Sequence, residues 1–405
     1  MLTLGKTTKR LIFACGLLAA AAGVAVGSGA FDGSKASAAP RRPVTKPARK
    51  IPRQAPGVWR RLPDAPIEVD AGLTSVWTGT EMIVSGVRAD SPGLSFAKST
   101  DVAAAFNPAT QTWRSLATPP RTQSFCRRSS VWTGKEMLVW SCDQFGFNPV
   151  TNTWRRLPSA PTQQGIVAWT GRELIGWGGG CCGDVSDSGS AYNPQTNTWR
   201  RLAPAPIPGQ QSPTGAWTGR ELVIFNGRDP DGKPVGGAAY NPTTDTWRRI
   251  PSMPGSAQFG IAVWDGSEIL IVGGHDQQGV PATVGLGYDP RTNRYRMLPP
   301  MDSGRTQAVA VWTGKQLVFW GGQTNRSRQG LAYDPSANRW SPLLQEAPLR
   351  PRVDPSAVWT GRELIVWGGV IGTPVGTSTP PQYPGDGAAY IPARTPPMPP
   401  QCCGG

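Results

Sequence analysis

One pattern of apolar and polar positions recurs seven times between residues 57 and 392. Each copy contains an apolar run ending in Trp-Thr-Gly or a close variant, a second apolar run ending in or near Gly-Gly, small residues before an aromatic residue, and a Trp-Arg-Arg-Leu-like segment. Short apolar runs bounded by Gly, Pro and Asn are typical of β-strands. The 3.6-residue period of an amphipathic helix is absent from the copies. The pattern therefore predicts four short antiparallel strands per copy, here lettered a to d, and an all-β domain.

Three independent markers give the same number of copies. The Trp of the first turn lies at Trp77, Trp132, Trp169, Trp217, Trp264, Trp312 and Trp359. The aromatic residue of the third run lies at Phe106, Phe147, Tyr192, Tyr240, Tyr288, Tyr333 and Tyr390. The aromatic residue of the last segment lies at Trp59, Trp113, Trp154, Trp199, Trp247, Tyr295 and Trp340. The mean period is about 48 residues, within the range of propeller and solenoid repeats.

These residues resemble the kelch repeat. A hydrophobic strand ends in Gly-Gly, and an aromatic residue and a Trp follow with six residues between them, as in Tyr192 to Trp199, Tyr240 to Trp247 and Tyr333 to Trp340. Three copies depart from Gly-Gly and read Ser85-Gly86, Ser141-Cys142 and Asn226-Gly227. The resemblance implies a β-propeller, in which every blade packs between two neighbours. We therefore expect an all-β, seven-bladed β-propeller of four-stranded antiparallel blades.

The two ends of the repeat predict how the ring closes. The first aromatic-Arg-Arg-Leu segment, Trp59 to Leu62, precedes any strand a, whereas the seventh copy stops after Tyr390-Ile391-Pro392 without a strand d of its own. The N-terminal strand is therefore expected to complete the last blade. This arrangement would leave no open seam in the propeller, which we place at residues 57–392.

Outside the propeller the composition changes. Lys6, Lys9 and Arg10 precede an apolar run over residues 11–26, and Ala36-Ser37-Ala38 offers a small-residue cleavage site. Residues 1–38 are therefore predicted to be a signal peptide or, if uncleaved, an N-terminal membrane anchor. Residues 39–56 are predicted to be a basic Pro-rich linker, and residues 393–405 a flexible Pro- and Cys-rich tail. We expect an exported protein of bacterial type, secreted or extracytoplasmic.

The positive charge is concentrated in the linker. The net charge of the chain is +15, and residues 39–61 carry eight bases and no acid. Because little of the charge belongs to the ring, no nucleic-acid partner is expected. The linker is predicted to contact an anionic envelope polymer or lipid headgroups, which attract Lys and Arg. A merely solvated spacer is the alternative interpretation.

The most repeated residues are predicted to belong to the scaffold. Arg155-Arg156, Arg200-Arg201 and Arg248-Arg249 occur in strand d, the outermost strand of a blade, where charge prevents edge-to-edge association. The seven turn tryptophans are likewise expected to hold blades together, since one residue fills the position in every blade. Function is therefore expected where the copies differ.

The connections between strands divide between two faces. The d-to-a and b-to-c loops share one, here called the variable face, and the a-to-b and c-to-d turns share the other, the uniform face. The longest variable loops are residues 87–101, 228–236 and 370–387. Both ends of the ring are expected on the uniform face, so a tethered ring would direct its variable loops outward.

The variable face is the default binding surface, because function tends to reside in loops on a rigid scaffold. The arginines there are candidate contacts for carboxylate or phosphate groups, and solvated loop charge is the alternative interpretation. The candidate binding residues are Arg127, Arg128, Asp184, Arg228, His275, Arg305, Arg326, Arg328, Arg352 and Asp354.

The residue inventory argues against several kinds of enzyme. His275 is the only histidine, so a copper oxidase resembling the kelch-type galactose oxidase, whose copper needs two histidines, is excluded, and zinc hydrolysis is unsupported. We assign no catalytic residue, metal ligand or cofactor. The first hypothesis is a noncatalytic exported module that binds an envelope glycan, peptide or protein as a monomeric ring. The alternative is a carbohydrate-active enzyme of kelch or sialidase-like type, with Arg and acidic residues at the axial mouth.

Cysteine usage agrees with export. Six cysteines follow the predicted signal segment, and an even number in an exported chain favours disulfides. Cys126 and Cys142 flank the turn of the second copy almost symmetrically, so they are predicted to form a bridge across strands a and b. The pairing of the other four cysteines is left open. Vicinal bridges and an intermolecular link are both possible for Cys181, Cys182, Cys402 and Cys403.

Overall fold

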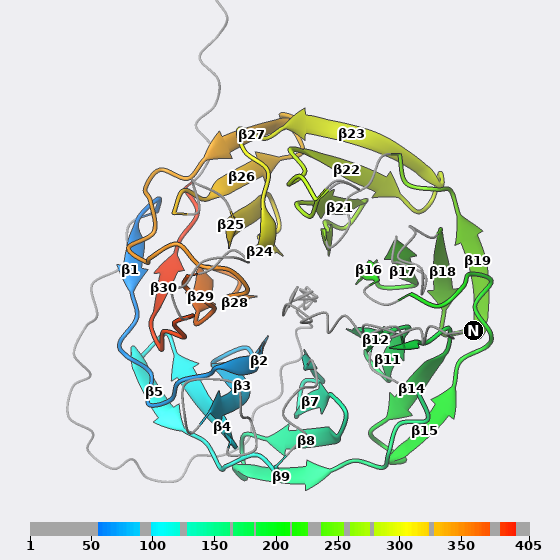
Figure 1. The fold of residues 1–405 in the computed structure, drawn as a ribbon, viewed down its shortest axis with the longest axis horizontal. Coiled ribbons are helices and arrows are strands. Elements are labelled where there is room, and N and C mark those ends of the chain that lie inside the picture. Colours follow the sequence, from blue (N-terminus) through cyan, green and yellow to red (C-terminus); the bar gives the residue numbers. More distant parts are fainter. Residues whose placement is uncertain are drawn as a thin grey trace, which may run out of the picture.

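The computed structural model describes residues 56–89, 99–121, 128–162, 165–181, 184–210, 213–225, 236–254, 260–275, 279–323, 328–372 and 381–393. Within these ranges, seven four-stranded antiparallel sheets are arranged as blades around a central axis (Figure 1). Every secondary-structure element in these ranges is a β-strand, and none is a helix. The expected all-β, seven-bladed propeller is confirmed.

In each blade, strands a to d follow one another from the axis to the rim. Blade 1 consists of β2 (Ala71–Trp77), β3 (Met82–Ala89), β4 (Ser99–Asn107) and β5 (Thr112–Ser115), and blade 2 of β6 (Ser129–Trp132), β7 (Met137–Trp140), β8 (Gln144–Asn148) and β9 (Thr153–Arg156). Blade 3 consists of β10 (Ile166–Trp169), β11 (Leu174–Trp177), β14 (Gly189–Asn193) and β15 (Thr198–Arg201), with the small hairpin β12 (Gly180–Cys181) and β13 (Asp184–Val185) between β11 and β14.

The remaining blades follow the same order. Blade 4 consists of β16 (Thr214–Trp217), β17 (Leu222–Phe225), β18 (Gly237–Asn241) and β19 (Thr246–Ile250), and blade 5 of β20 (Ile261–Trp264), β21 (Ile269–Val272), β22 (Val284–Asp289) and β23 (Arg294–Pro300). Blade 6 consists of β24 (Thr306–Trp312), β25 (Leu317–Gln323), β26 (Leu331–Asp334) and β27 (Arg339–Pro342). Blade 7 consists of β28 (Ser356–Trp359), β29 (Leu364–Trp367), β30 (Gly387–Tyr390) and β1 (Trp59–Arg61).

Blade 7 is completed by the N-terminal strand, as the sequence predicts. β1 pairs antiparallel with β30, and Trp59 lies opposite Tyr390. Just outside this pair, the Gly57 N–H donates to the Ile391 carbonyl over 2.7 Å. The ring is therefore closed by hydrogen bonds between the two ends of the repeat.

The a-to-b turns take their shape from a polar residue and a Gly. In blade 4 the Thr218 hydroxyl accepts the Glu221 N–H at 3.0 Å, and Asp265 takes the place of Thr in blade 5. The Gly of the seven turns has a φ between 87° and 103°. Residues other than Gly adopt this left-handed backbone only at an energetic cost. This explains why Trp-Thr-Gly recurs without much change.

The hydrophobic core lies between blades rather than within them. Seven clusters of buried side chains each combine residues from two neighbouring blades, one cluster for each boundary of the ring. The seven turn tryptophans are partly buried, and each packs against one of these clusters. Because each blade shares its core with both neighbours, the stability of every blade depends on the closure of the ring.

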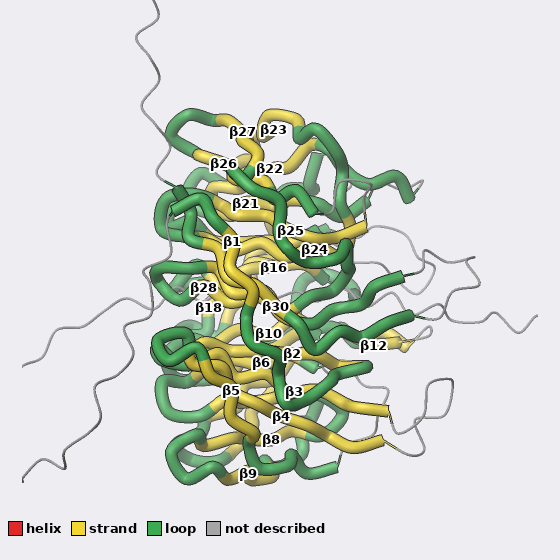
Figure 2. The backbone as a smooth tube through the Cα atoms, turned by 90° about the vertical axis from the view of Figure 1, so that its left-hand side faces the viewer, coloured by secondary structure: helices red, strands yellow, loops and turns green. Residues whose placement is uncertain are grey.

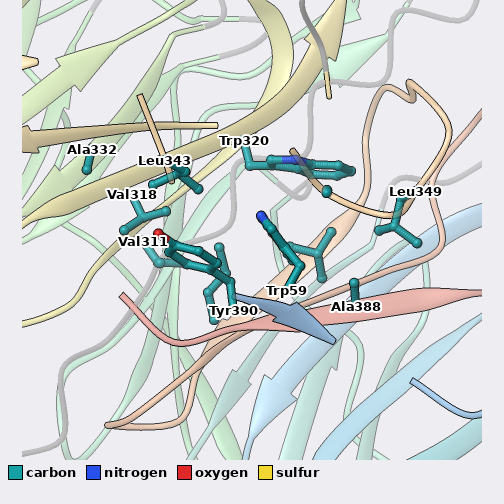
Figure 3. Close-up of a cluster of buried hydrophobic side chains, with 12 residues drawn as sticks. Trp59, Val311, Val318, Trp320, Ala332, Leu343, Leu349, Ala388 and Tyr390 are labelled. Atoms are coloured by element: carbon teal, nitrogen blue, oxygen red, sulfur yellow. The ribbon is translucent and has the colours of Figure 1, made fainter. Parts of the chain in front are cut away.

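The cluster between blades 6 and 7 shows what β1 contributes (Figure 3). The ring of Trp59 lies 5.8 Å from that of Trp320 in blade 6 and 5.0 Å from that of Tyr390, between centroids. Trp59 Nε1 also donates to the Gln345 carbonyl at 3.1 Å. In the six other blades, the strand-d aromatic residue likewise donates to a backbone carbonyl at or just beyond the end of the preceding strand d. This residue therefore links each blade to the preceding one.

The first Arg of strand d has a more specific role than the expected edge protection. Arg248 donates to both carboxylate oxygens of Glu221 in its own blade, at 3.1 and 2.8 Å. Its Nη1 also reaches the Tyr288 hydroxyl and Asn293 Oδ1 in blade 5, at 3.4 and 3.1 Å. The bond to Glu221 raises the pKa of Arg248 above its ordinary value. The second Arg, such as Arg249, is exposed at the edge, as expected.

The same contact recurs at four other boundaries. Among the described residues, Arg114 of blade 1 bonds only Glu81 of its own blade, and the Arg itself is missing from blade 6. Arg155, Arg200 and Arg296 bond a Glu of their own blade and a Tyr of the next, and Arg60 of β1 joins Glu363 to Gln111 in blade 1. Blade 6 has Gln316 and Ser341 in place of the Glu and Arg. Its neighbour, blade 7, ends after Tyr390 and lacks the c-to-d turn that would supply the acceptor. At the boundary between blades 6 and 7, both the strand-d Arg and the residue that would accept its hydrogen bond are therefore absent.

Replacing Tyr240 by Phe should lower the free energy of unfolding by about 1 kcal/mol, the usual value of one hydrogen bond. The Tyr240 hydroxyl donates to Asp245 at 2.6 Å and accepts from Arg200 at 3.2 Å. Blade 2 offers the matched reverse change, because Phe147 fills this position there. Phe147→Tyr should add stability if its hydroxyl reaches Asn152. Denaturant unfolding of both variants measures the two effects, and equal stability of Tyr240→Phe and wild type would contradict the assigned contact.

One predicted loop is partly strand. β3 and β4 pair through Ala89 and Ser99, so the ladder extends into the loop predicted over residues 87–101. The Asp70 carboxylate accepts the Ala89 N–H at 2.6 Å and supports the added pairing. Residues 90–98 lie outside the described part of the chain.

Candidate functional site

The two faces of the ring differ as the sequence predicts in the kind of connection they carry. Viewed from the side, short hairpin turns line one edge of the ring, and the longer connections, including β12, extend from the other (Figure 2). The candidate residues that the structure describes belong to these longer connections or to the strand ends beside them. The described candidate residues therefore belong to the variable face.

Several predicted residues cannot be placed. Arg127, Arg228, Arg326 and Cys126 lie outside the described residues. Asp184 is described only by its backbone, which pairs with Cys181 between β13 and β12. The assignment of these residues to a binding site stays a prediction.

Arg128 is part of the scaffold. Its guanidinium forms an ion pair with Asp101 of β4, and both side chains are only 3% exposed. The pair joins the start of strand a in blade 2 to strand c in blade 1. A cation already neutralised at this depth has little capacity to hold a ligand.

Arg305 and Arg352 occupy equivalent positions in blades 6 and 7, seven residues before the turn tryptophans Trp312 and Trp359. Both are buried, so the alternative interpretation of solvated loop charge does not hold for them. Arg305 Nη1 donates to the Gly321 carbonyl at 3.4 Å, and Arg352 Nη1 donates to the Gly368 carbonyl at 3.1 Å. Each guanidinium thus lies against the Gly-Gly pair of its own blade.

Gly-Gly itself links one blade to the next. Gly321 and Gly322 have φ of 76° and 90°, and the Gly322 N–H donates to the Arg352 carbonyl of blade 7 at 3.0 Å. The Gly274 N–H donates in the same way to the Arg305 carbonyl at 2.9 Å. The backbone of each Arg is therefore held by the preceding blade, and its side chain reaches the glycines of its own blade.

The two arginines differ in how well they are paired. Arg352 bonds Asp386 at 2.6 Å, and its Nε donates to the Arg350 carbonyl at 3.0 Å. Arg305 contacts the Phe319 ring, with its central carbon 5.6 Å from the ring centroid. Neither Nε nor Nη2 of Arg305 has a hydrogen-bond partner among the described residues. Arg305 is therefore a buried cation with two unsatisfied donors.

The electrostatics of Arg305 agree with this geometry. Burial lowers the pKa of Arg305 to about 10, and the charge of Asp302 opposes this shift only in part. The guanidinium is still protonated at neutral pH, three units below that value. A buried, charged donor without a partner is costly, and an acidic group bonded to it would remove the cost.

Asp354 and His275 lie near these elements without forming a catalytic set with them. Asp354, with a φ of 48°, accepts from Gln307 Nε2 at 2.8 Å and so joins blades 6 and 7. His275 is half-buried and pairs with Pro281 in an isolated bridge of the b-to-c connection in blade 5. Arg328 is exposed and lies 3.6 Å from Glu346. Of the predicted residues that the structure describes, Arg352 and Asp354 lie at the boundary between blades 6 and 7, and Arg305 reaches Gly321 beside that boundary.

The acids near the arginines are engaged within the fold. Asp386 accepts from Arg352 and lies 3.8 Å from Arg61. Among the described residues, no group of three His, Cys, Asp or Glu side chains could hold a metal ion. Asp101 and Asp386 were not foreseen as partners, since each lies far along the chain from the Arg that it binds. Aligning the copies on the turn Trp would have singled out Arg305 and Arg352 as equivalent.

The predicted Cys126–Cys142 bridge can be tested by mass. Cys142 follows β7, and its expected partner is outside the described residues, so the bridge stays a prediction. Alkylation without reduction should leave both thiols unlabelled, because a disulfide does not react with the reagent. Labelling of both would exclude the bridge, and Cys181 and Cys182 serve as internal comparison.

Comparison with known proteins gives one family. A family model described as the kelch motif matches residues 178–206, from the Gly-Gly pair of blade 3 to beyond β15. No curated protein matches the chain. In the described ranges, no helix is long and apolar enough to cross a membrane.

Proposed function

We propose that this chain, a kelch-repeat β-propeller by its seven blades and its family match, is an exported, noncatalytic module that binds a partner protein on its variable face. The fold suggests protein interaction, since kelch propellers generally bind protein partners. Export and a place at the cell envelope follow from the predicted signal segment. The residue that we expect to contact the partner is Arg305.

The unsatisfied guanidinium of Arg305 carries this proposal. A scaffold arginine would have its charge paired with a carboxylate, as Arg352 has with Asp386 and Arg128 with Asp101. Nη2 of Arg352 is also without a hydrogen-bond partner among the described residues, but Arg305 differs in bonding no carboxylate there. Arg305 instead retains two donors that an Asp or Glu carboxylate could accept in the bidentate geometry typical of arginine. Of the other six copies only blade 7 has an Arg at this position, Arg352, and that Arg is paired with Asp386.

The depth of Arg305 has a kinetic consequence. The residue is 0% exposed, so an acidic side chain can reach it only after a covering segment shifts. Association should therefore be slower than for a preformed surface site. The enzyme alternative finds less support, because Asp386, the acid bonded to Arg352, is already neutralised.

A peptide array tests the proposal. Full-length protein is applied to peptides containing Asp or Glu and to the same peptides with Asn or Gln. Acidic peptides should bind the wild type and lose at least about tenfold in affinity with Arg305→Met, as expected when a buried charged hydrogen bond is removed. Arg350→Met, an exposed change on the same face, is the matched control and should bind normally.

Two outcomes would contradict the proposal. Acidic peptides that bind Arg305→Met as tightly as wild type would exclude Arg305 as the contact. Turnover of a glycan substrate that is lost in Arg305→Met would favour the carbohydrate-active enzyme instead.

A further inference from the structure

The uniform face carries a ring of basic side chains that the fold does not explain. The residue between Gly and Glu or Gln in the a-to-b turn is basic in five blades and is exposed in all seven. The five bases are Lys135, Arg172, Arg220, Lys315 and Arg362, and the other two positions hold Thr80 and Ser267. Among the described residues, no hydrogen bond or ion pair engages the five basic side chains. Their charge is therefore not used in the scaffold.

The neighbouring acids do not neutralise this ring. Glu136, Glu173, Glu221 and Glu363 follow four of the five bases, and each is already bonded to an Arg of strand d. The fifth base, Lys315, precedes the neutral Gln316. The further acids in the seven turns are Asp265, which forms the turn in blade 5, and Glu81 and Glu268, which are bonded to Arg114 and Arg296 of strand d. The ring therefore keeps most of its positive charge.

The arrangement suits an extended anion rather than a small one. Strands a of neighbouring blades contact one another around the axis, so their turns encircle the axis at one end of the ring (Figures 1 and 2). Each base belongs to a different blade and is exposed, so the five do not converge on one pocket. A flat surface of many anions can engage all five at once.

The chain also enters the ring from this face. β1 begins next to the c-to-d turns, and Gly57 contacts Ile391 there. Residues 39–53 add six bases directly before it, and the apolar residues 11–26 precede β1 by 33 positions. Membrane insertion of that apolar run would keep the uniform face close to a bilayer.

We propose that the uniform face is a docking surface for anionic phospholipid headgroups, engaged by Lys135, Arg172, Arg220, Lys315 and Arg362. The docked ring lies flat on the bilayer with its variable loops directed away from it. These residues are separate from Arg305, so this docking and the proposed partner binding can fail independently.

Vesicle sedimentation of the full chain tests the docking surface. Vesicles of phosphatidylcholine mixed with phosphatidylglycerol are compared with vesicles of phosphatidylcholine alone. The ring variant replaces all five bases by Gln. The control variant makes the same charge change with Arg88, Arg121, Arg201, Arg328 and Arg350, which are exposed at the rim or on the variable face. Both variants keep the basic linker, and their melting temperatures check that they fold.

The ring variant should bind anionic vesicles at least about tenfold more weakly than wild type, because each base near an anionic surface contributes to the attraction. The control variant should stay within about twofold of wild type, and raised salt should weaken binding by screening. A gain-of-function variant, Thr80→Lys with Ser267→Lys, completes the ring and should bind about threefold more tightly or better.

Three results would overturn the docking surface. The first is an equal loss in the ring and control variants, which would mean a diffuse charge effect. The second is unchanged vesicle binding in both the ring variant and the gain-of-function variant. The third is ring-dependent binding of soluble polyphosphate together with ring-independent binding of vesicles, which would assign the face to an anionic polymer.

Discussion

Deleting residues 1–62 should abolish the cooperative unfolding of the ring, whereas deleting residues 1–55 should leave it unchanged. The longer deletion removes β1 and Leu62. It therefore takes Trp59 from the core cluster between blades 6 and 7 and Leu62 from the cluster between blades 7 and 1. The loss of a buried Trp and a buried Leu costs about 3–5 and 2–5 kcal/mol, respectively. The sum is comparable with the whole net stability of a typical domain.

The expected loss of stability is large because β1 contacts both blades that flank blade 7. Trp59 packs on Trp320 of blade 6, and Arg60 joins Glu363 to Gln111 of blade 1. β1 therefore supports both boundaries of the last blade. Calorimetry of the two deletions measures the effect, and a single sharp transition at the wild-type temperature after deletion of residues 1–62 would contradict closure by β1.

Arg352→Met should lower the free energy of unfolding by about 2–3 kcal/mol. The change removes the 2.6 Å bond to Asp386 and leaves the Gly368 carbonyl without this donor. Breaking a buried ion pair costs about 3–5 kcal/mol, and the loss here should be smaller because Asp386 is 26% exposed and retains Arg61.

The matched control is Arg350→Met, two residues earlier. Arg350 is exposed and bonds the Gln382 side chain, so its loss should change the stability by no more than about 0.5 kcal/mol. Urea unfolding of the two variants gives the comparison. Equal losses would show that Arg352 has no special role in blade 7.

The propeller could be predicted because the same sequence motifs recur in its seven copies. Trp-Thr-Gly and the aromatic-Asn-Pro turn each recur with the backbone conformation that their residues favour, and the unpaired first and last segments indicate the closure. The predicted function of the arginine pairs was only half right. Arg249 is an exposed edge charge, but Arg248 binds Glu221 and reaches the next blade, a contact that depends on the register between blades.

The sequence predicts on which face the candidate residues lie, but not which of them are buried. Loop sequences do not reveal which arginine meets an acid from a distant segment, as Arg128 meets Asp101. Arg305 and Arg352 have the same position in their repeats, yet only Arg352 finds a carboxylate. Burial in these loops is decided by contacts between blades, which single repeats do not encode.

The central claim is that Arg305 serves binding and is not needed for the stability of the propeller. The free energy of unfolding of Arg305→Met tests this claim most directly. Met fills similar space beside Phe319 and has no donors to satisfy, and replacing a poorly paired buried charge by an apolar group is often neutral or stabilising. The variant should be as stable as wild type or more stable by about 1–2 kcal/mol. A loss as large as that of Arg352→Met would show that Arg305 belongs to the scaffold and would contradict its proposed role in binding.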